Sequence, residues 1–436
     1  MSIVNTLVNT MNNYLPNSVG LFVNRIATNR LSMATHQRPN TFSLWSPPDT
    51  NSPSQYLTWH TVTDKRYFDL HLHPANPQYI ASLPDNSPTE QFPLGEITQL
   101  FSRGKNFKKG RSSVFFMFFA QWFTDGFFRS DFHDGRKTTT NHNIDLSQIY
   151  GANEEIANIL RSGQGGKLNS QIIKGEEYPD DLGEIGADGF WQVKDKYQDL
   201  PYIKDVDVRK KVIDVVSEQK KLNLYATGLE RGNSILGNIC FSTLFLREHN
   251  SICLELAQAY PSWDDERLFH TARIINTVIL MKLVIEDYVN HIAGLKVLRM
   301  DPSFVEKQEW YRTPWIAAEF NLLYRWHSLI PENLQLNGQA ESLVANYGLL
   351  RNEGLDAIFS AASQQSAGNI TLNNVPDFML PTERIMIEKG RQWCLPSYNQ
   401  YRQQFNMDKL THFSEFTKDT DLQNKLEKLY GSVDQV

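Results

Sequence analysis

The chain has few cysteines, little net charge and no long apolar run without charged residues. Its 436 residues include only three cysteines, Cys240, Cys253 and Cys394, and none of them forms a CxxC pair with zinc-ligand spacing. Three cysteines are too few for a disulfide framework, so the composition favours a reducing, cytoplasmic setting. The 43 basic and 49 acidic residues give a net charge of -6, which provides no broad positive field for a nucleic-acid backbone. We therefore expect no nucleic-acid partner.

Negative charge is missing from the N-terminus. Residues 1–48 contain no Asp or Glu, and their only formally charged side chains are arginines. Apolar residues recur there at helical spacing on both sides of Pro16, which predicts two short amphipathic helices. We expect residues 1–41 to form a separate segment, which either packs on the body as a cap or lies in the interface of a membrane.

The rest of the chain, residues 42–436, is predicted to be a mostly α-helical body. Helical patterning covers residues 112–128 and runs almost continuously from about 214 to 294. Its most apolar part, residues 267–294, carries five charged side chains, so we expect a buried core helix and not a membrane span. Another apolar helix is predicted over residues 315–330.

Two predicted helices place polar side chains together. Tyr324 and His327 lie three residues apart, so both are expected on one face of the helix over 315–330. Gln121 and Asp125 lie four residues apart among seven phenylalanines. From composition alone, such pairs are more often hydrogen-bonded core residues than ligands. The alternative is that they face a flat apolar cofactor.

Six segments appear in a recognisable order: FAQWFTDGFF, NIDLSQIYG, LREHNSICLELAQAYPSWDDERLFHTARI, VIEDYVNHIAG, AAEFNLLYRWHSLIPENL and LPSYNQYRQQF. Together they resemble the cyclooxygenase and fatty-acid dioxygenase branch of the animal-type haem peroxidase superfamily, over roughly residues 56–436. An ordered set of six motifs is more specific than any one of them. The resemblance implies one large, mostly α-helical catalytic body with a b-type haem between helices.

The resemblance also implies which residues hold the haem. His327, in the YRWH segment, matches the family's proximal ligand to the haem iron. Asn399, in LPSYNQYR, matches a residue that orients this histidine through its other ring nitrogen. Arg402 matches a partner of a haem propionate, and Gln121 matches the distal-side glutamine near which peroxide binds.

A second group of matches concerns the oxidation of a lipid. Tyr324 matches the tyrosine whose radical removes a hydrogen atom from the fatty acid, and Tyr288 matches a neighbouring tyrosine that hydrogen-bonds to it. Five positions that line the acyl channel of relatives remain apolar here: Phe123, Phe127, Val284, Val289 and Phe320. The resemblance thus implies a peripheral membrane enzyme that converts an unsaturated fatty acid and O2 into a lipid hydroperoxide.

Two of the departures from the family pattern concern chemistry. Asp125 stands where the family has its distal histidine. Either burial lets this carboxyl do the acid–base work, or the chain is a haem-binding protein or pseudo-enzyme with impaired peroxidase chemistry. Leu70 and Leu295 stand where cyclooxygenases hold the substrate carboxylate, and His71 or His73 are the alternative partners.

A third departure concerns length. The chain ends where relatives continue into another helical segment that closes the channel. We expect either a second polypeptide that completes this C-terminal part or a shortened product. Besides the dioxygenase and the haem-binding pseudo-enzyme, the chain has a third possible function. It would be a haem peroxidase that oxidises small electron donors and has no lipid channel, but such an enzyme needs no tyrosine at position 324.

Overall fold

The computed structural model describes residues 17–35, 66–72, 93–131, 134–294, 296–311 and 315–436. Helices dominate these residues, and their strands pair only as two-stranded antiparallel ribbons. The predicted mostly α-helical body is confirmed.

The longer helices are α2 (Asn17–Thr35), α7 (Val114–Asp125), α13 (Leu236–Ala259), α14 (Asp265–Leu283), α19 (Leu355–Gln364), α20 (Leu380–Gln392) and α22 (Thr420–Tyr430). The shorter ones are α6 (Leu94–Gln99), α8 (Ser147–Tyr150), α9 (Glu154–Leu160), α10 (Pro201–Lys204), α11 (Val206–Val212), α12 (Glu218–Lys221), α15 (Asn290–Ala293), α16 (Pro302–Val305), α17 (Ala318–Leu323), α18 (Leu349–Glu353) and α21 (Tyr398–Gln404). The ribbons join β1 (Lys109–Ser113) to β8 (Ser366–Gly368), β2 (Ser170–Ile173) to β3 (Glu176–Pro179), β4 (Gly183–Ile185) to β5 (Trp191–Val193), and β6 (Leu334–Leu336) to β7 (Gln339–Glu341).

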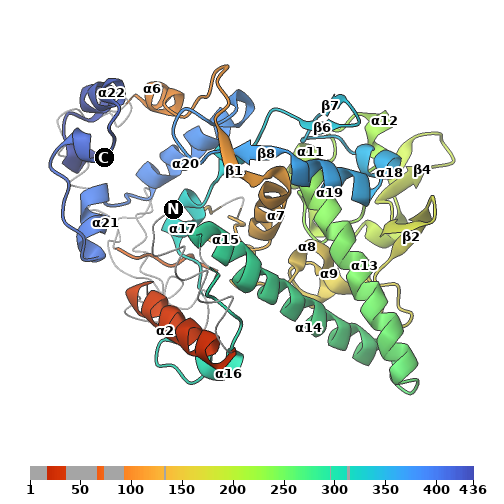
Figure 1. Ribbon diagram of the computed structural model, residues 1–436. Coiled ribbons are helices and arrows are strands. Elements are labelled where there is room, and N and C mark those ends of the chain that lie inside the picture. The colour runs from red at the N-terminus through yellow and green to blue at the C-terminus, as the bar shows by residue number, and fades with distance from the viewer. Residues whose placement is uncertain (1–16, 36–65, 73–92, 132–133, 295, 312–314) are drawn as a thin grey trace, which may run out of the picture.

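Helix α7 lies in the centre of the molecule and packs on α13 (Figure 1). It begins after Ser113, whose side chain accepts a hydrogen bond from the backbone N–H of Phe116 and so caps the first turn. Phe118 and Trp122 are fully buried on its inner face. A Cβ at Gly237 of α13 would lie 2.6 Å from the Phe118 ring, so only glycine permits this close approach of the two helices.

Helices α13 and α14 are held together by a buried polar network. His249 of α13 contacts the Tyr150 hydroxyl through Nδ1 and the Gly166 carbonyl through Nε2, each at 2.9 Å. Asn276 of α14 donates to the same tyrosine at 3.1 Å. Because a carbonyl only accepts, His249 carries its proton on Nε2 and accepts from Tyr150 through Nδ1.

Helix α14 continues through a π-helical segment, Val284–Val289, into α15. One face of this run is buried, while Ile274 (65% exposed), Val278 and Ile292 face outward. The run Asp265–Ala293 is long and apolar enough to cross a membrane by length and composition alone. The expectation of a buried core helix is therefore met by one face only.

The helix predicted over residues 315–330 is wrong in its second half. α17 ends at Leu323, Tyr324 has φ -81° and ψ 57°, and a 3-10 turn begins at His327. The side chain of Arg325 donates from Nε to the Asn321 carbonyl at 2.8 Å and from Nη2 to Asn321 Oδ1 at 2.6 Å. Arg325 thereby occupies the carbonyl that would accept the next helical N–H, and the helix stops.

The continuous helix predicted from about residue 214 is also wrong at its start. Residues 222–235 are not helical, and local hydrogen bonds satisfy part of their backbone. Asn233, for example, bonds both the N–H and the carbonyl of Tyr225 at 2.9 Å. Asparagine competes with helix in this way because its short amide reaches the backbone.

Helix α2 begins directly after Pro16, where the second N-terminal helix was predicted. It is attached to the body by polar contacts: Arg25 Nε donates to Asp301 at 2.8 Å, and Asn24 accepts from the Arg299 N–H at 2.8 Å. Phe22 and Met33 remain exposed. The first predicted helix lies outside the described residues. The two predicted roles of the N-terminal segment, a cap on the body and an anchor in a membrane interface, therefore both stay predictions.

Candidate active site

A pair of tyrosines from distant parts of the chain forms the centre of the site. The hydroxyl of Tyr288, on the π-helical segment, lies 2.9 Å from the hydroxyl of Tyr324, just after α17. Burial raises the pKa of both phenols above the ordinary value. Both groups are therefore protonated at neutral pH, and each can donate a hydrogen bond or give up a hydrogen atom.

Aromatic side chains enclose the tyrosine pair. The Phe320 ring lies 4.7 Å from that of Tyr324, and the Phe123 ring lies 5.6 Å from that of Tyr288. Phe127 contacts both phenylalanines, at 4.9 Å from Phe123 and 6.4 Å from Phe320. The remaining two predicted channel positions, Val284 and Val289, begin and end the same π-helical segment as Tyr288. The five positions thus gather around one apolar region.

His327 begins the 3-10 turn three residues after Tyr324 and is buried. Its Nδ1 lies 2.8 Å from Oε1 of Glu383, in the first turn of α20. An ionised carboxylate only accepts hydrogen bonds, so Nδ1 of His327 is the donor in this contact and Nε2 is the other ring nitrogen. No hydrogen bond of Nε2 occurs within the part of the chain that the structure describes.

Asn399 and Arg402 of α21 make local contacts in the C-terminal part of the chain. The Asn399 amide donates to the Leu410 carbonyl at 2.9 Å and to Asp434 at 2.7 Å, so it ties α21 to the C-terminal segment. Arg402 donates from Nε to the Asp408 carbonyl at 2.6 Å. The expected contact between Asn399 and His327 is wrong, because the partner of His327 is a carboxylate on α20.

A cavity of about 390 Å³ lies between the end of α7 and α20, within the size range of small-molecule sites. Thr382, Ile385, Met386 and Lys389 line one wall, and their spacing places them on one face of α20. Trp122, Asp125 and Asn238 line the opposite wall.

Asp125 faces this cavity from the last turn of α7. It accepts a hydrogen bond from Nδ2 of Asn238. Burial raises the pKa of the Asp125 carboxyl above its ordinary value, and this effect exceeds the opposing pull of Arg231 and the Asn238 hydrogen bond. A carboxyl in this state holds its proton more tightly than an exposed one and can serve as a proton donor.

Cationic side chains also line the same cavity: Arg129, Arg231, Arg325 and Lys389. Burial lowers the pKa of Arg325 to about 10. Burial, Arg325 and Arg231 together lower the pKa of Lys389. The lining also includes the carboxyls of Asp125, Asp131 and Glu230, and Glu230 pairs with Arg129. The cavity therefore combines both signs of charge, with Arg231, Arg325 and Lys389 as the cations that can meet an anionic group of a ligand.

These donors fit a haem in their chemistry. The buried imidazole of His327 is not among the described residues that line the cavity, but its Nε2 is a nitrogen of the kind that binds haem iron, and the arginines of the lining suit propionates. Asn238 Oδ1 and Gln148 Oε1 also line the cavity, and both are buried acceptors without a hydrogen-bond donor among the described residues. They fit a small donor molecule such as a peroxide or water.

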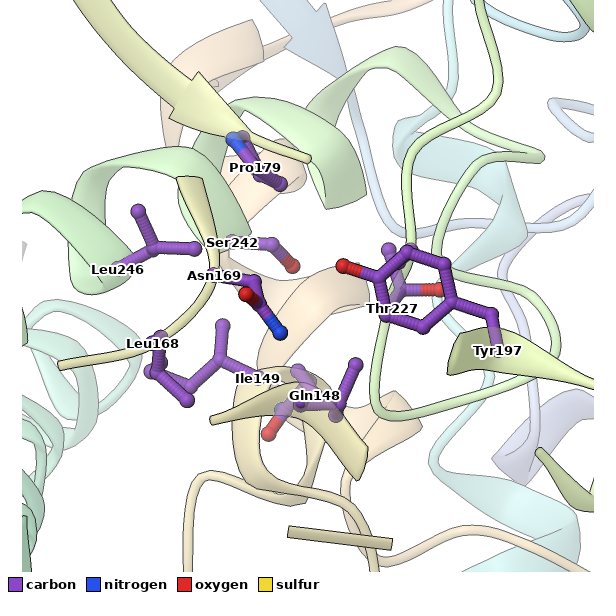
Figure 2. A pocket seen from close by; sticks show the side chains of 11 residues that line it. Gln148, Ile149, Leu168, Asn169, Pro179, Tyr197, Thr227, Ser242 and Leu246 are labelled. Carbon is purple, nitrogen blue, oxygen red and sulfur yellow. The ribbon is translucent and has the colours of Figure 1, made fainter. Parts of the chain in front are cut away.

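Gln121, the predicted distal glutamine, is half-buried and is not among the described residues that line this cavity. Gln148 of α8 is the glutamine that does line it, and its Nε2 donates to the Trp122 carbonyl at 2.8 Å. Gln148 and Ser242 also line a second cavity of about 10 Å³, which has room for at most one water (Figure 2). The two cavities therefore share the side chains of Gln148 and Ser242 as lining residues.

The residues expected near a substrate carboxylate are only partly described. Leu70 is buried in the main core. His71 is half-buried, with its ring 5.6 Å from that of Phe405. Leu295 and His73 lie outside the described residues.

Sequence reasoning missed Glu383, Asn238 and Arg325. Arg325 stands inside the YRWH segment, two residues before His327, so its position in the motif could have indicated a place near the site. The four cavity residues of α20 recur at helical spacing, which would have revealed one face. Asn238 gave no such signal, because its spacing does not set it apart from the other polar residues of α13.

Comparisons with known proteins identify the family of the chain. The model of the animal haem peroxidase family matches residues 126–436. Prostaglandin G/H synthase 2 from Bos taurus is 32% identical over 406 residues, which cover 89% of this chain and 62% of the relative. Prostaglandin G/H synthase 1 from Rattus norvegicus is 31% identical with the same coverage. The chain thus spans about 62% of the length of these curated relatives.

Solved structures show the same fold. Peroxidase A from Dictyostelium discoideum has a TM-score of 0.64 at 18% identity, and the match covers 85% of this chain and 80% of that one. The fatty acid alpha-dioxygenase of Oryza sativa has a TM-score of 0.62 at 16% identity, with coverage of 100% and 83%. The resemblance drawn from the six segments is confirmed, and the chain belongs to the animal haem peroxidase family.

Proposed function

We propose that the protein is a haem-dependent dioxygenase that uses a Tyr324 radical to form a lipid hydroperoxide from an unsaturated fatty acid and O2. The observation that carries the proposal is the hydrogen-bonded pair of Tyr324 and Tyr288, enclosed by phenylalanines and three residues before His327. The similarity to prostaglandin G/H synthases and to the fold of a fatty acid alpha-dioxygenase supports the same class of reaction.

The cofactor in this proposal is haem b, with His327 as its axial ligand and the cavity cations as partners of its propionates. When bound and oxidised by a peroxide, the haem supplies the one-electron oxidant for Tyr324. Asp125 is suited to hold or release the proton of a peroxide in the cavity, because burial keeps its carboxyl protonated over a wider pH range.

The remaining steps belong to the protein and the substrate. The Tyr324 oxygen radical takes a hydrogen atom from a weak C–H bond of the acyl chain, so that one O–H bond forms as one C–H bond breaks. The carbon radical binds O2, and the resulting peroxyl radical recovers a hydrogen atom from Tyr324. This yields the hydroperoxide and restores the radical. Tyr288 donates a hydrogen bond to the Tyr324 oxygen throughout and holds it in place.

The test is the variant Tyr324→Phe, which keeps the ring and its packing. We expect it to retain the haem absorption band and to lose at least about 100-fold in oxygen uptake with unsaturated fatty acids. Tyr260→Phe is the matched control, because Tyr260 is exposed and stacks on Trp263, away from the tyrosine pair. Full oxygen uptake by Tyr324→Phe would exclude the radical mechanism.

One observation favours a second candidate function. On the resemblance, Asp125 stands where the family has its distal histidine, so the chain is alternatively a haem-binding protein whose peroxide chemistry is impaired. The wild-type protein distinguishes the two readings. Haem binding without oxygen uptake, on a panel of fatty acids with peroxide supplied, would favour this alternative.

A further inference from the structure

The proximal side of the site contains a charged group that no motif indicated. Glu383 lies in the first turn of α20, where the positive end of the helix dipole favours a carboxylate. Its side chain and that of His327 are each 11% exposed, and the contact joins residues 56 positions apart. Two polar side chains buried together at this sequence distance are fixed by the packing of α20 on α17.

A neutral partner would be enough to orient the imidazole. An amide or carbonyl oxygen accepts from Nδ1–H and fixes the ring, which was the role expected of Asn399. A carboxylate does more, because a charge-assisted hydrogen bond draws the proton away from Nδ1 and increases electron density on Nε2.

We infer that Glu383 is a positioning residue that makes His327 a strongly electron-donating ligand and thereby stabilises the ferric over the ferrous state of a bound haem. The inference rests on the ligation of haem by His327 in the proposed function. It adds a residue that acts on the iron through the histidine, since hydrogen bonding to an axial ligand is one of the ways in which a protein tunes haem.

The surroundings of the carboxylate support an electrostatic role. Arg325 and Lys389 are the nearby cations of the cavity, and Arg325 is held by Asn321. Among the described residues, Glu383 forms its one hydrogen bond and its one ion pair with His327 and none with either cation. The direct contact of the carboxylate is thus with the imidazole, while the same charge also acts through space on Arg325.

The test compares haem-loaded wild type with Glu383→Gln, which preserves the shape and the hydrogen bond but removes the charge. We expect the variant to raise the Fe(III)/Fe(II) midpoint potential. A tenfold change in the relative affinity for the two oxidation states corresponds to about 59 mV for a one-electron couple. The iron–histidine stretching frequency of the ferrous form, measured by resonance Raman spectroscopy, is expected to fall.

Glu388→Gln is the matched control. It makes the same chemical change on the same helix, but Glu388 pairs with Arg384 and is half-exposed. The potential and the stretching frequency are expected to stay at the wild-type values. If Glu383→Gln also leaves both unchanged, the inference is overturned.

Two further variants separate this inference from the proposed function. If His327→Ala leaves the haem spectrum unchanged, the axial ligand is misassigned and the proposed function fails at its first step. If Glu383→Gln loses haem, Glu383→Asp is measured in its place. A haem-loaded Glu383→Asp with a potential near that of the wild type supports the role of the charge, whereas loss of haem in both folded variants overturns it.

Discussion

Asp125 occupies the position where the resemblance predicts a distal histidine, and the two side chains differ in their protonation at neutral pH. Histidine is half-protonated near neutral pH, whereas an ordinary carboxyl is ionised there. In this chain burial shifts the Asp125 carboxyl toward its protonated form, while Asn238 and Arg231 favour the ionised form. Acid–base chemistry at this position therefore depends on how far the carboxyl of Asp125 is shielded from water.

The cost of burying this carboxyl gives the first prediction. The folded state holds its proton at a higher pH than the unfolded chain does, so wild-type stability falls as pH rises through that window. We expect Asp125→Asn to be more stable than wild type at pH 7 in the haem-free protein, with a difference that shrinks toward pH 4. Urea denaturation at several pH values measures this. A difference independent of pH would contradict it.

The second prediction concerns the rate of reaction with peroxide. A histidine at position 125 is an effective base at neutral pH. We expect Asp125→His to speed the change in the haem absorption band after mixing with peroxide by at least about tenfold. A wild-type protein that is already fast at pH 7, and is slowed by this change, would show that Asp125 is itself the tuned group.

At the scale of elements, periodicity located the helices but not their ends. The helix over 112–128 was predictable because its apolar spacing and the Ser113 cap agree. The end of α17 was not, since it depends on the side chain of Arg325 competing for the Asn321 carbonyl. That break matters for the site, because Tyr324 and His327 do not share one helical face and point to different partners, Tyr288 and Glu383.

The network between α13 and α14 gives the third prediction. Burial lowers the pKa of His249 to about 4, while in the unfolded chain it is about 6.5. Between these two pH values the unfolded chain binds a proton at His249 and the folded state does not. The free energy of unfolding therefore falls by about 3 kcal/mol as the pH drops from about 6.5 to 4. We expect His249→Gln to flatten this part of the profile of melting temperature against pH. His270→Gln is the comparison, and its effect on the slope is expected to be much smaller, because its ion pair with Glu266 is exposed to solvent.

At the scale of the whole molecule, the family match was readable because its six segments keep their order along the chain. What sequence could not supply is the set of contacts between segments. His327 and Glu383 are 56 positions apart, and Asp125 and Asn238 are 113 apart. No spacing rule links such pairs, so Asn399 was assigned to a place that Glu383 occupies.

The fourth prediction concerns the surface of the whole protein. Helix α2 is fixed to the body by Arg25 and Asn24 yet exposes Phe22, Leu31 and Met33. If this segment is an interfacial anchor, replacing the three exposed residues with serine should reduce co-sedimentation with anionic lipid vesicles several-fold. Phe190→Ser, at an equally exposed phenylalanine of the β4–β5 ribbon, should have no effect. Unchanged binding by the triple variant would make α2 a cap.

The π-helical segment Val284–Val289 has a consequence for insertions and deletions. A hydrogen bond from residue i to i+5 accommodates one residue more per turn than an α-helix does. Deleting one residue from regular α14 would rotate every side chain after it, Tyr288 included, by about 100° and turn Tyr288 away from Tyr324. Deleting one residue within the π-helical segment would instead let that segment relax into ordinary α-helix, so the residues after it would keep nearly the same direction. The long helix should therefore tolerate a one-residue deletion in this segment better than anywhere along α14.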